Sequence, residues 1–428
     1  MAESEVAAGS AGTRLPRGRL TILLYCGAVI VALNFVNPSV GLFVVPLSFL
    51  LKNKLHLSAT ELATFTLWAG IPGYLSFAFG LARDFWSPFG LGDRGYFLLF
   101  GALSALVFLV FAFVPMSETS IFLVAMLTAI AFLFMWSAWN GLGSTLGQRH
   151  AMSGQISALW NFGGTVAIAA ALFLGGRLSE WLEPMSASAA ALRLYLIAAA
   201  ILALVAGLGA WKPAAVFDSL PPISARDFTA DIKRLFRHWP IYPALIAWLL
   251  WNFSPGTLTV LQYYMSDVLH ASDAQWGEYN AVYFAASIPA YVLFGFLSPR
   301  LSLRVLLWGG AVLGVTQMLP LLLVHSATGV LVAAIPIGLT GGIATAAYMD
   351  LLIRSCPKGL EGTMMMACWS MYTVAVNFGN LWGTDLYDRH GGFTACVIAT
   401  TIVYALILPV IAFVPRHLIA TADGTAPA

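Results

Sequence analysis

Positions 71–83 read IPGYLSFAFGLAR, and positions 288–300 read IPAYVLFGFLSPR. The two stretches lie 217 residues apart, and each joins an Ile-Pro pair to an apolar run that ends at arginine. A second pair of landmarks lies upstream, where positions 34–41 read NFVNPSVG and positions 252–256 read NFSPG, at an offset of 218 residues. Apolar stretches can be alike by chance, but matched landmarks at a nearly constant offset favour an internal duplication.

The composition shows what kind of chain is duplicated. Of the 428 residues, 60% are hydrophobic and 9% are charged, whereas about 25% are charged in soluble domains. A soluble enzyme, a nucleic-acid-binding protein and a disordered chain are therefore excluded, and the net charge of +2 identifies no partner. A membrane-spanning helix needs about 20 apolar residues. Runs of this length predict an all-α integral membrane protein, since a membrane barrel would show short alternating strands.

Breaks in hydropathy predict twelve spans, with six on each side of one long polar stretch. This organisation divides the chain into an N-terminal six-helix bundle at 1–211, a cytoplasmic linker at 212–239 and a C-terminal six-helix bundle at 240–428. The predicted spans lie near residues 20–51, 59–82, 95–115, 120–146, 153–176, 193–211, 240–267, 274–298, 303–324, 329–353, 362–385 and 392–414.

The distribution of basic residues predicts the orientation of these spans. With the N-terminus in the cytoplasm, 16 of the 21 lysines and arginines fall on the cytoplasmic side, as the positive-inside rule requires. Both termini are then cytoplasmic. Arginines outnumber lysines 16 to 5, and the one glycosylation sequon without proline, at Asn252, lies inside a span. Both features favour the inner membrane of a bacterium.

Two cytoplasmic segments carry a resemblance to known transporters. Positions 80–96, GLARDFWSPFGLGDRGY, resemble the loop signature of the major facilitator superfamily, whose twelve helices form two parallel repeats. The resemblance implies that Asp84 caps or pairs across the two halves and that Arg94 anchors the loop. An ordinary charged turn is the alternative. The matching segment SPRLSLR, at 298–304, has lost the acid.

A narrower resemblance lies in the second half. Positions 356–367, CPKGLEGTMMMA, are similar to the Cys-Pro-x-Gly-x-Glu-x-Thr signature of the folate–biopterin transporter family, with Glu361 as its acid. That family also carries an acid in the fourth span, whereas positions 135–150 here contain none.

The predicted substrate site lies near the middle of the membrane, between the halves. Polar and aromatic side chains at midspan are the candidates, because polar groups in lipid are costly and usually face a cavity or another helix. Packing and interhelical hydrogen bonds are the alternative for each of them. The predicted site residues are Asn34, Asn37, Trp136, Trp139, Asn140, Asn161, Trp251, Asn252, Gln262, Tyr283, Trp369, Tyr372, Asn377 and Asn380, with Trp160 beside them.

Charged side chains are absent from the centre of every predicted span. A cavity lined by aromatic rings and amides suits a neutral or weakly charged organic solute. Coupling to an ion would then use Asp350 or Asp385 near the span ends, although Asp350 and Arg354 are more simply a helix-end salt bridge. The predicted gating residues are Asp84, Arg94, Asp350, Arg354 and Glu361.

The resulting hypothesis is that the chain transports a small organic solute by alternating access. The solute would be neutral or would carry an aromatic or heteroaromatic ring, as a pterin does. An enzyme is disfavoured because the seven histidines are dispersed, and the four cysteines lack metal or disulfide spacing and are interpreted as packing residues. A non-transporting assembly or pigment-delivery factor of the same fold is the alternative. We expect a small-molecule substrate and the lipid bilayer as partners, a monomer, and no cofactor, metal site or nucleic acid.

Overall fold

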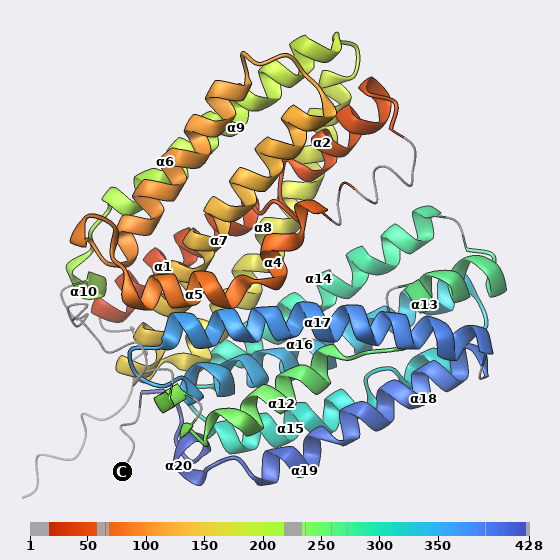
Figure 1. Cartoon of the computed structure of the whole chain (residues 1–428). Coiled ribbons are helices and arrows are strands. Elements are labelled where there is room, and N and C mark those ends of the chain that lie inside the picture. The colour runs from red at the N-terminus through yellow and green to blue at the C-terminus, as the bar shows by residue number, and fades with distance from the viewer. Residues whose placement is uncertain are drawn as a thin grey trace, which may run out of the picture.

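The computed structural model describes residues 17–57, 65, 68–217, 233–235, 237–257, 259–271, 273–389 and 391–424. All regular elements within these ranges are helices. In Figure 1 the helices of residues 17–217 form the upper group and those from residue 241 onward form the lower group. Much of the predicted linker, at 218–232 and 236, lies outside the described residues, as do 59–64 and 66–67 of the second predicted span.

The first group contains the elements that the sequence assigns to six spans. They are α1 (Arg17–Phe35), α2 (Val44–Phe49), η1 (Leu50–Lys54), α4 (Ile71–Tyr74), α5 (Ser76–Phe85), η2 (Pro88–Gly90), α6 (Asp93–Phe111), α7 (Glu118–Arg149), α8 (Ser153–Leu182), α9 (Ala187–Ala210) and α10 (Ala214–Phe217).

The second group repeats this arrangement. Its elements are α12 (Ile241–Asn252), α13 (Thr259–Tyr263), η3 (Tyr264–Val268), α14 (Asp273–Leu297), α15 (Leu303–Thr316), η4 (Leu319–Leu323), α16 (Ala327–Ser355), α17 (Glu361–Arg389), α18 (Gly392–Ala405), α19 (Ile407–Ala412) and α20 (Arg416–Ile419).

Nine helical segments of the described residues are long and apolar enough to cross a membrane. The remaining predicted spans correspond to α4 with α5, to α12 with α13, and to α17. Large apolar side chains such as Leu204 and Phe173 are exposed, which is the expected surface of a helix that faces lipid. The all-α, twelve-span fold expected from the sequence is confirmed.

Two predicted spans are interrupted at related places. The prediction of one continuous run at 20–51 is wrong, because α1 ends at Phe35 and α2 begins at Val44. In the second half α12 ends at Asn252. Pro38 and Pro255 follow these ends, and proline can neither donate a backbone hydrogen bond nor continue a helix without distortion.

The other pair of prolines behaves differently in the two halves. Pro72 lies in the short helix α4, which kinks into α5 at Leu75, where φ is −95° and ψ is 19°. Pro289 lies inside α14, which continues through it. The duplication is therefore closer at the first helix of each half than at the second.

The halves meet mainly along four helix pairs, in which α5 and α7 pack on α17 and α8 packs on α14 and α16. The contact of α5 with α17 is visible in Figure 1. We name the two ends of the molecule by residues that lie there. The Asp84 end holds the C-terminus of α5 and the N-terminus of α17, and the Lys54 end holds η1 and the C-terminus of α8.

Candidate functional site

An aromatic cluster joins the two halves. It consists of Trp136 and Trp139 on α7, Trp160 on α8, and Trp369 and Tyr372 on α17. The rings of Trp136 and Trp369 meet edge-to-face across the halves, with centroids 5.5 Å apart. Trp160 lies 5.8 Å from Trp136 and 5.4 Å from Trp139, and Trp369 stacks on Tyr372 at 5.1 Å. All five were candidates on sequence grounds, and three-dimensional packing brings them together.

Two members of this cluster carry unused hydrogen-bond donors. Trp136 and Trp139 are 2% and 0% exposed. Their indole N–H groups have no acceptor among the described residues. A buried donor without a partner costs free energy, and most buried polar groups in proteins are paired. These two N–H groups are therefore unsatisfied donors inside the cluster.

The midspan asparagines share one geometry. In each, the amide nitrogen donates to the carbonyl four residues earlier in its own helix, at 2.7–2.9 Å. This bond holds the side chain against its helix and does not use the amide oxygen, which can accept a hydrogen bond from elsewhere. The asparagines with this geometry are Asn34, Asn140, Asn161, Asn252 and Asn377.

Two other candidates, Asn37 and Asn380, accept hydrogen bonds from backbone N–H groups within the same half. Asn37 accepts a hydrogen bond from the Ser39 N–H at 2.9 Å, within the turn after α1. Asn34 and Asn37, both predicted within the first span, do not share one helical face, because α1 ends at Phe35. Asn380 accepts from the backbone N–H of Thr259, which begins α13.

The predicted site residues of the seventh span do not form one helical stripe, because α12 and α13 are separate helices. Trp251, on α12, donates to Thr345 at 3.0 Å and packs on Tyr404 within the second half. Gln262, on α13, is exposed. Tyr283, on α14, is half-buried and stacks on Tyr279 with centroids 6.4 Å apart.

A polar network closes the Asp84 end. Asp84 is 6% exposed, and its Oδ2 atom accepts from both the backbone N–H and the hydroxyl of Thr363 at 2.6 Å. Its Oδ1 atom accepts from the Gly362 N–H at 3.2 Å. The carboxylate of α5 thus caps the N-terminus of α17, where unpaired N–H groups favour negative charge. Thr363 could have been found from the sequence, since it is the threonine of the signature that contains Glu361.

Arg83 holds this carboxylate in place. Its guanidinium donates to Asp84 at 2.8 Å and to both oxygens of Asp93 at 2.7 and 2.8 Å. It lies directly over Gly141 of α7, where a Cβ atom would come within 2.4 Å of the guanidinium carbon. The roles of Arg83 and Asp93 were missed because the pairing depends on how the loop folds back.

The remaining predicted gating residues also lie at this end. Arg94 donates to the carbonyl oxygens of Gly209 and Ala210, so it fastens the loop to the end of α9. The Glu361 carboxylate accepts from the Gly359 N–H at 2.8 Å.

Asp350 and Arg354 form more than a helix-end pair. Arg354 bridges the buried carboxylate of Asp350, at 2.8 Å, and that of Asp423, at 3.0 Å. Asp423 lies in the C-terminal tail, far from Asp350 in sequence, and no local pattern predicts this contact.

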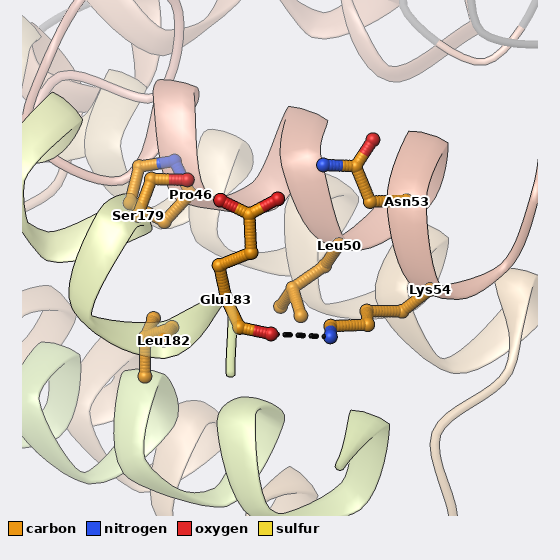
Figure 2. A pocket seen from close by; sticks show the side chains of 7 residues that line it. All are labelled: Pro46, Leu50, Asn53, Lys54, Ser179, Leu182 and Glu183. Carbon is orange, nitrogen blue, oxygen red and sulfur yellow. Dashed lines mark hydrogen bonds between the residues drawn. The ribbon is translucent and has the colours of Figure 1, made fainter. Parts of the chain in front are cut away.

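A pocket lies away from both of these sites. It is lined by residues of η1, α2 and α8 in the first half, and the Lys54 ammonium donates to the backbone carbonyl of Glu183 beside it at 2.7 Å (Figure 2). Because all of its lining comes from one half, it does not correspond to the predicted site between the halves.

Comparison with known sequences identifies the family. The sequence model of the Major Facilitator Superfamily matches residues 24–383. The chain belongs to this superfamily. A folate-biopterin transporter of Synechocystis is 23% identical over 359 residues, which cover 81% of this chain and 71% of the relative.

Solved structures of the superfamily share the fold. The transporter FucP in its outward conformation superposes with a TM-score of 0.72 at 17% identity, covering 93% of this chain and all of that one. The proton:xylose symporter XylE superposes with a TM-score of 0.67 at 11% identity, covering 95% and 98% of the two chains. The present chain is therefore a multi-pass membrane transporter of small solutes and not an enzyme, as its sequence indicated.

This superfamily member contains a native reporter of opening at the Asp84 end. Cys356 is 5% exposed, and its carbonyl oxygen accepts from the side chain of Gln148 in the other half at 2.8 Å. Burial raises the pKa of the Cys356 thiol, and the thiol form is a poor nucleophile. Separation of the halves at this end would expose Cys356 to a maleimide. Cys26 and Cys396, which are buried within single halves, would remain protected unless the protein unfolds.

A first prediction concerns the contact of α5 with α17. A Cβ atom on Gly80 would lie 2.5 Å from the Gly362 carbonyl oxygen and 2.7 Å from the Thr363 Cα atom. Since both are backbone atoms, Gly80→Ala must push the helices apart, at a cost of about 1–3 kcal/mol. We expect about tenfold faster maleimide labelling of Cys356 in Gly80→Ala. Gly73→Ala, where no atom lies within 4 Å, should label at the wild-type rate, and equal rates for the two variants would contradict the prediction.

Proposed function

We propose that this transporter carries a neutral aromatic or heteroaromatic solute by alternating access, with a pterin as the first candidate. The observation that carries the proposal is the aromatic cluster, which draws its rings from both halves and contains two indole N–H groups without acceptors. Flat rings bind well between aromatic side chains. A heteroaromatic solute also supplies the acceptor atoms that these N–H groups lack.

The distribution of charge supports an uncharged solute. The buried carboxylates of the described residues are Asp84, Asp93, Asp350, Glu361 and Asp423. All five lie at the Asp84 end, and the aromatic cluster is composed of uncharged side chains. A charged solute there would lose its hydration without gaining a counter-charge. The relative from Synechocystis is named for folate and biopterin, and of these two biopterin fits an uncharged site better.

The contacts between the halves support the transport cycle. Besides the Asp84 network, Gln148 donates to the carbonyl oxygens of Ile353 and Cys356, and Ser157 donates to that of Ala346. These bonds join α7 and α8 to α16 from the Asp84 end inward. The structure thus has the features of a state closed at the Asp84 end. Breaking these bonds would let a solute reach the aromatic cluster from that end.

The distribution of basic residues supports a proposal for the orientation of the transporter in the membrane. Basic residues gather at the Asp84 end, so we place that end and both termini in the cytoplasm. We propose division into bundles at 1–211 and 240–428, a monomer, and the inner membrane of a bacterium.

A ligand screen tests the proposal. Purified protein would be heated with biopterin, folate, nucleosides and sugars, since a ligand that binds the folded state raises its melting temperature. We expect biopterin to give a larger shift than any sugar, followed by saturable uptake of biopterin into proteoliposomes. A larger shift with sugars would contradict the substrate class. Binding without uptake would favour an assembly or delivery factor.

A further inference from the structure

The second half lacks the acid that closes the first. Its segment SPRLSLR, at 298–304, is the counterpart of the loop that follows α5, and it contains no aspartate or glutamate. We propose that the C-terminal tail replaces this acid, and that residues 421–424 act as a C-terminal latch that holds the Asp84 end closed. This inference is independent of which solute the transporter carries.

Asp423 occupies the place where the missing carboxylate would act. Its side chain is almost fully buried. The Oδ2 atom accepts from the backbone N–H of Gln155 at 2.9 Å, and the Oδ1 atom accepts weakly from the Ser153 hydroxyl at 3.4 Å. Its own backbone N–H donates to the Ser298 carbonyl oxygen at 2.9 Å, within the segment that lost the acid.

The arrangement parallels the Asp84 network. Asp84 accepts from backbone N–H groups in the first turn of α17, and Asp423 accepts from one in the first turn of α8. These helices are the fifth spans of the two halves, so the duplication relates them. In both places a carboxyl group of one half accepts hydrogen bonds from the N-terminus of a helix in the other half.

Arg354 ties the latch to both halves. Besides binding Asp423, it donates to the Thr421 carbonyl oxygen at 2.9 Å and to the Ser153 hydroxyl at 2.9 Å. Ser153 belongs to α8 in the first half, whereas Arg354 belongs to α16 in the second. The N-terminus of α8 therefore cannot separate from α16 while the latch is docked.

Gly154 permits this approach. A Cβ atom at Gly154 would lie 3.0 Å from the Oδ2 atom of Asp350 and 3.0 Å from the Oδ2 atom of Asp423. It would lie 2.5 Å from the Ser298 Cβ atom. The glycine thus allows two carboxylates, one from α16 and one from the tail, to reach the end of α8 together.

The test compares Asp423→Ala, and a chain truncated after Ile419, with wild type and with Asp388→Ala. Asp388 is exposed on α17 and is a matched control. The readout is the maleimide labelling rate of Cys356, measured by peptide mass spectrometry without solute. We expect labelling about tenfold faster in both latch variants, with Asp388→Ala unchanged and Cys26 and Cys396 protected. Wild-type labelling of Cys356 in both latch variants would overturn the proposal.

The latch also predicts a pH dependence. Burial and the negative charge of Asp350 raise the pKa of Asp423 from 3.8 to about 7, against the opposing charge of Arg354. Arg19 of α1 lies against the next residue, Gly424, and donates to the carbonyl oxygen of His150. The pKa of the His150 side chain is lowered by burial and by Arg149 and Arg19.

A raised pKa means that the docked tail binds a proton more tightly than the free tail. Docking is therefore strongest at low pH and weakens as the pH rises through 7, by about tenfold between about pH 6 and pH 8. The labelling rate of Asp423→Ala divided by that of wild type at the same pH cancels the intrinsic reactivity of the thiol. We expect this ratio to fall about tenfold over that range. A constant ratio would show that Asp423 does not titrate in the latch.

Discussion

Replacing Trp369 with alanine is expected to weaken solute binding by about tenfold to 100-fold and to abolish measurable uptake. Trp369 is the half-buried member of the aromatic cluster that meets Trp136 across the halves, and it also stacks on Tyr372. Stacking of a flat heterocycle on an aromatic side chain contributes about 1–3 kcal/mol. The melting-temperature shift with biopterin and the initial rate of uptake measure the two effects.

Trp382→Ala is the matched control. Trp382 lies on the same helix, is 44% exposed, and packs its ring against Phe253 within the second half. Because Trp382 lies outside the aromatic cluster, its loss should leave solute affinity within about twofold of wild type. A twofold change corresponds to about 0.4 kcal/mol. If Trp369→Ala bound biopterin as tightly as wild type, the solute site would have to lie outside the aromatic cluster.

Asp84→Asn is expected to slow uptake by about 100-fold while leaving solute affinity within about twofold of wild type. Both oxygens of Asp84 accept from donors, so an amide NH2 at either position would face another donor. Losing two charge-assisted bonds costs about 3 kcal/mol, or about 100-fold in the equilibrium that closes this end. Uptake rates, biopterin melting shifts and Cys356 labelling separate the conformational effect from binding.

Thr363→Val identifies the partner of Asp84. It removes the hydroxyl that donates to Oδ2 at 2.6 Å and keeps the backbone N–H. Because the two side chains share one contact, their effects on Cys356 labelling should be less than additive. Additive effects, or a selective loss of biopterin binding in Asp84→Asn, would contradict a role in closing this end.

Some of the site could be predicted because it depends on residue type and depth. The rings of the aromatic cluster lie at midspan, where large aromatic side chains are readily noticed. Asp84 was identified because its loop signature has a local pattern. The position of Gln262 could not be predicted, because the break at Pro255 separates α13 from α12, and helical periodicity cannot be carried across such a break.

By itself, the sequence determined that this chain spans the membrane many times as helices in two related halves. In lipid, such long apolar runs can pair all of their backbone N–H and C=O groups only as helices. The repeated Asn-Phe and Ile-Pro landmarks are evidence of the duplication. Only the tertiary structure decided which rings meet between the halves and that Asp423 reaches the N-terminus of α8. Such contacts join residues far apart in the chain, and their energy depends on how helices pack and not on any local pattern.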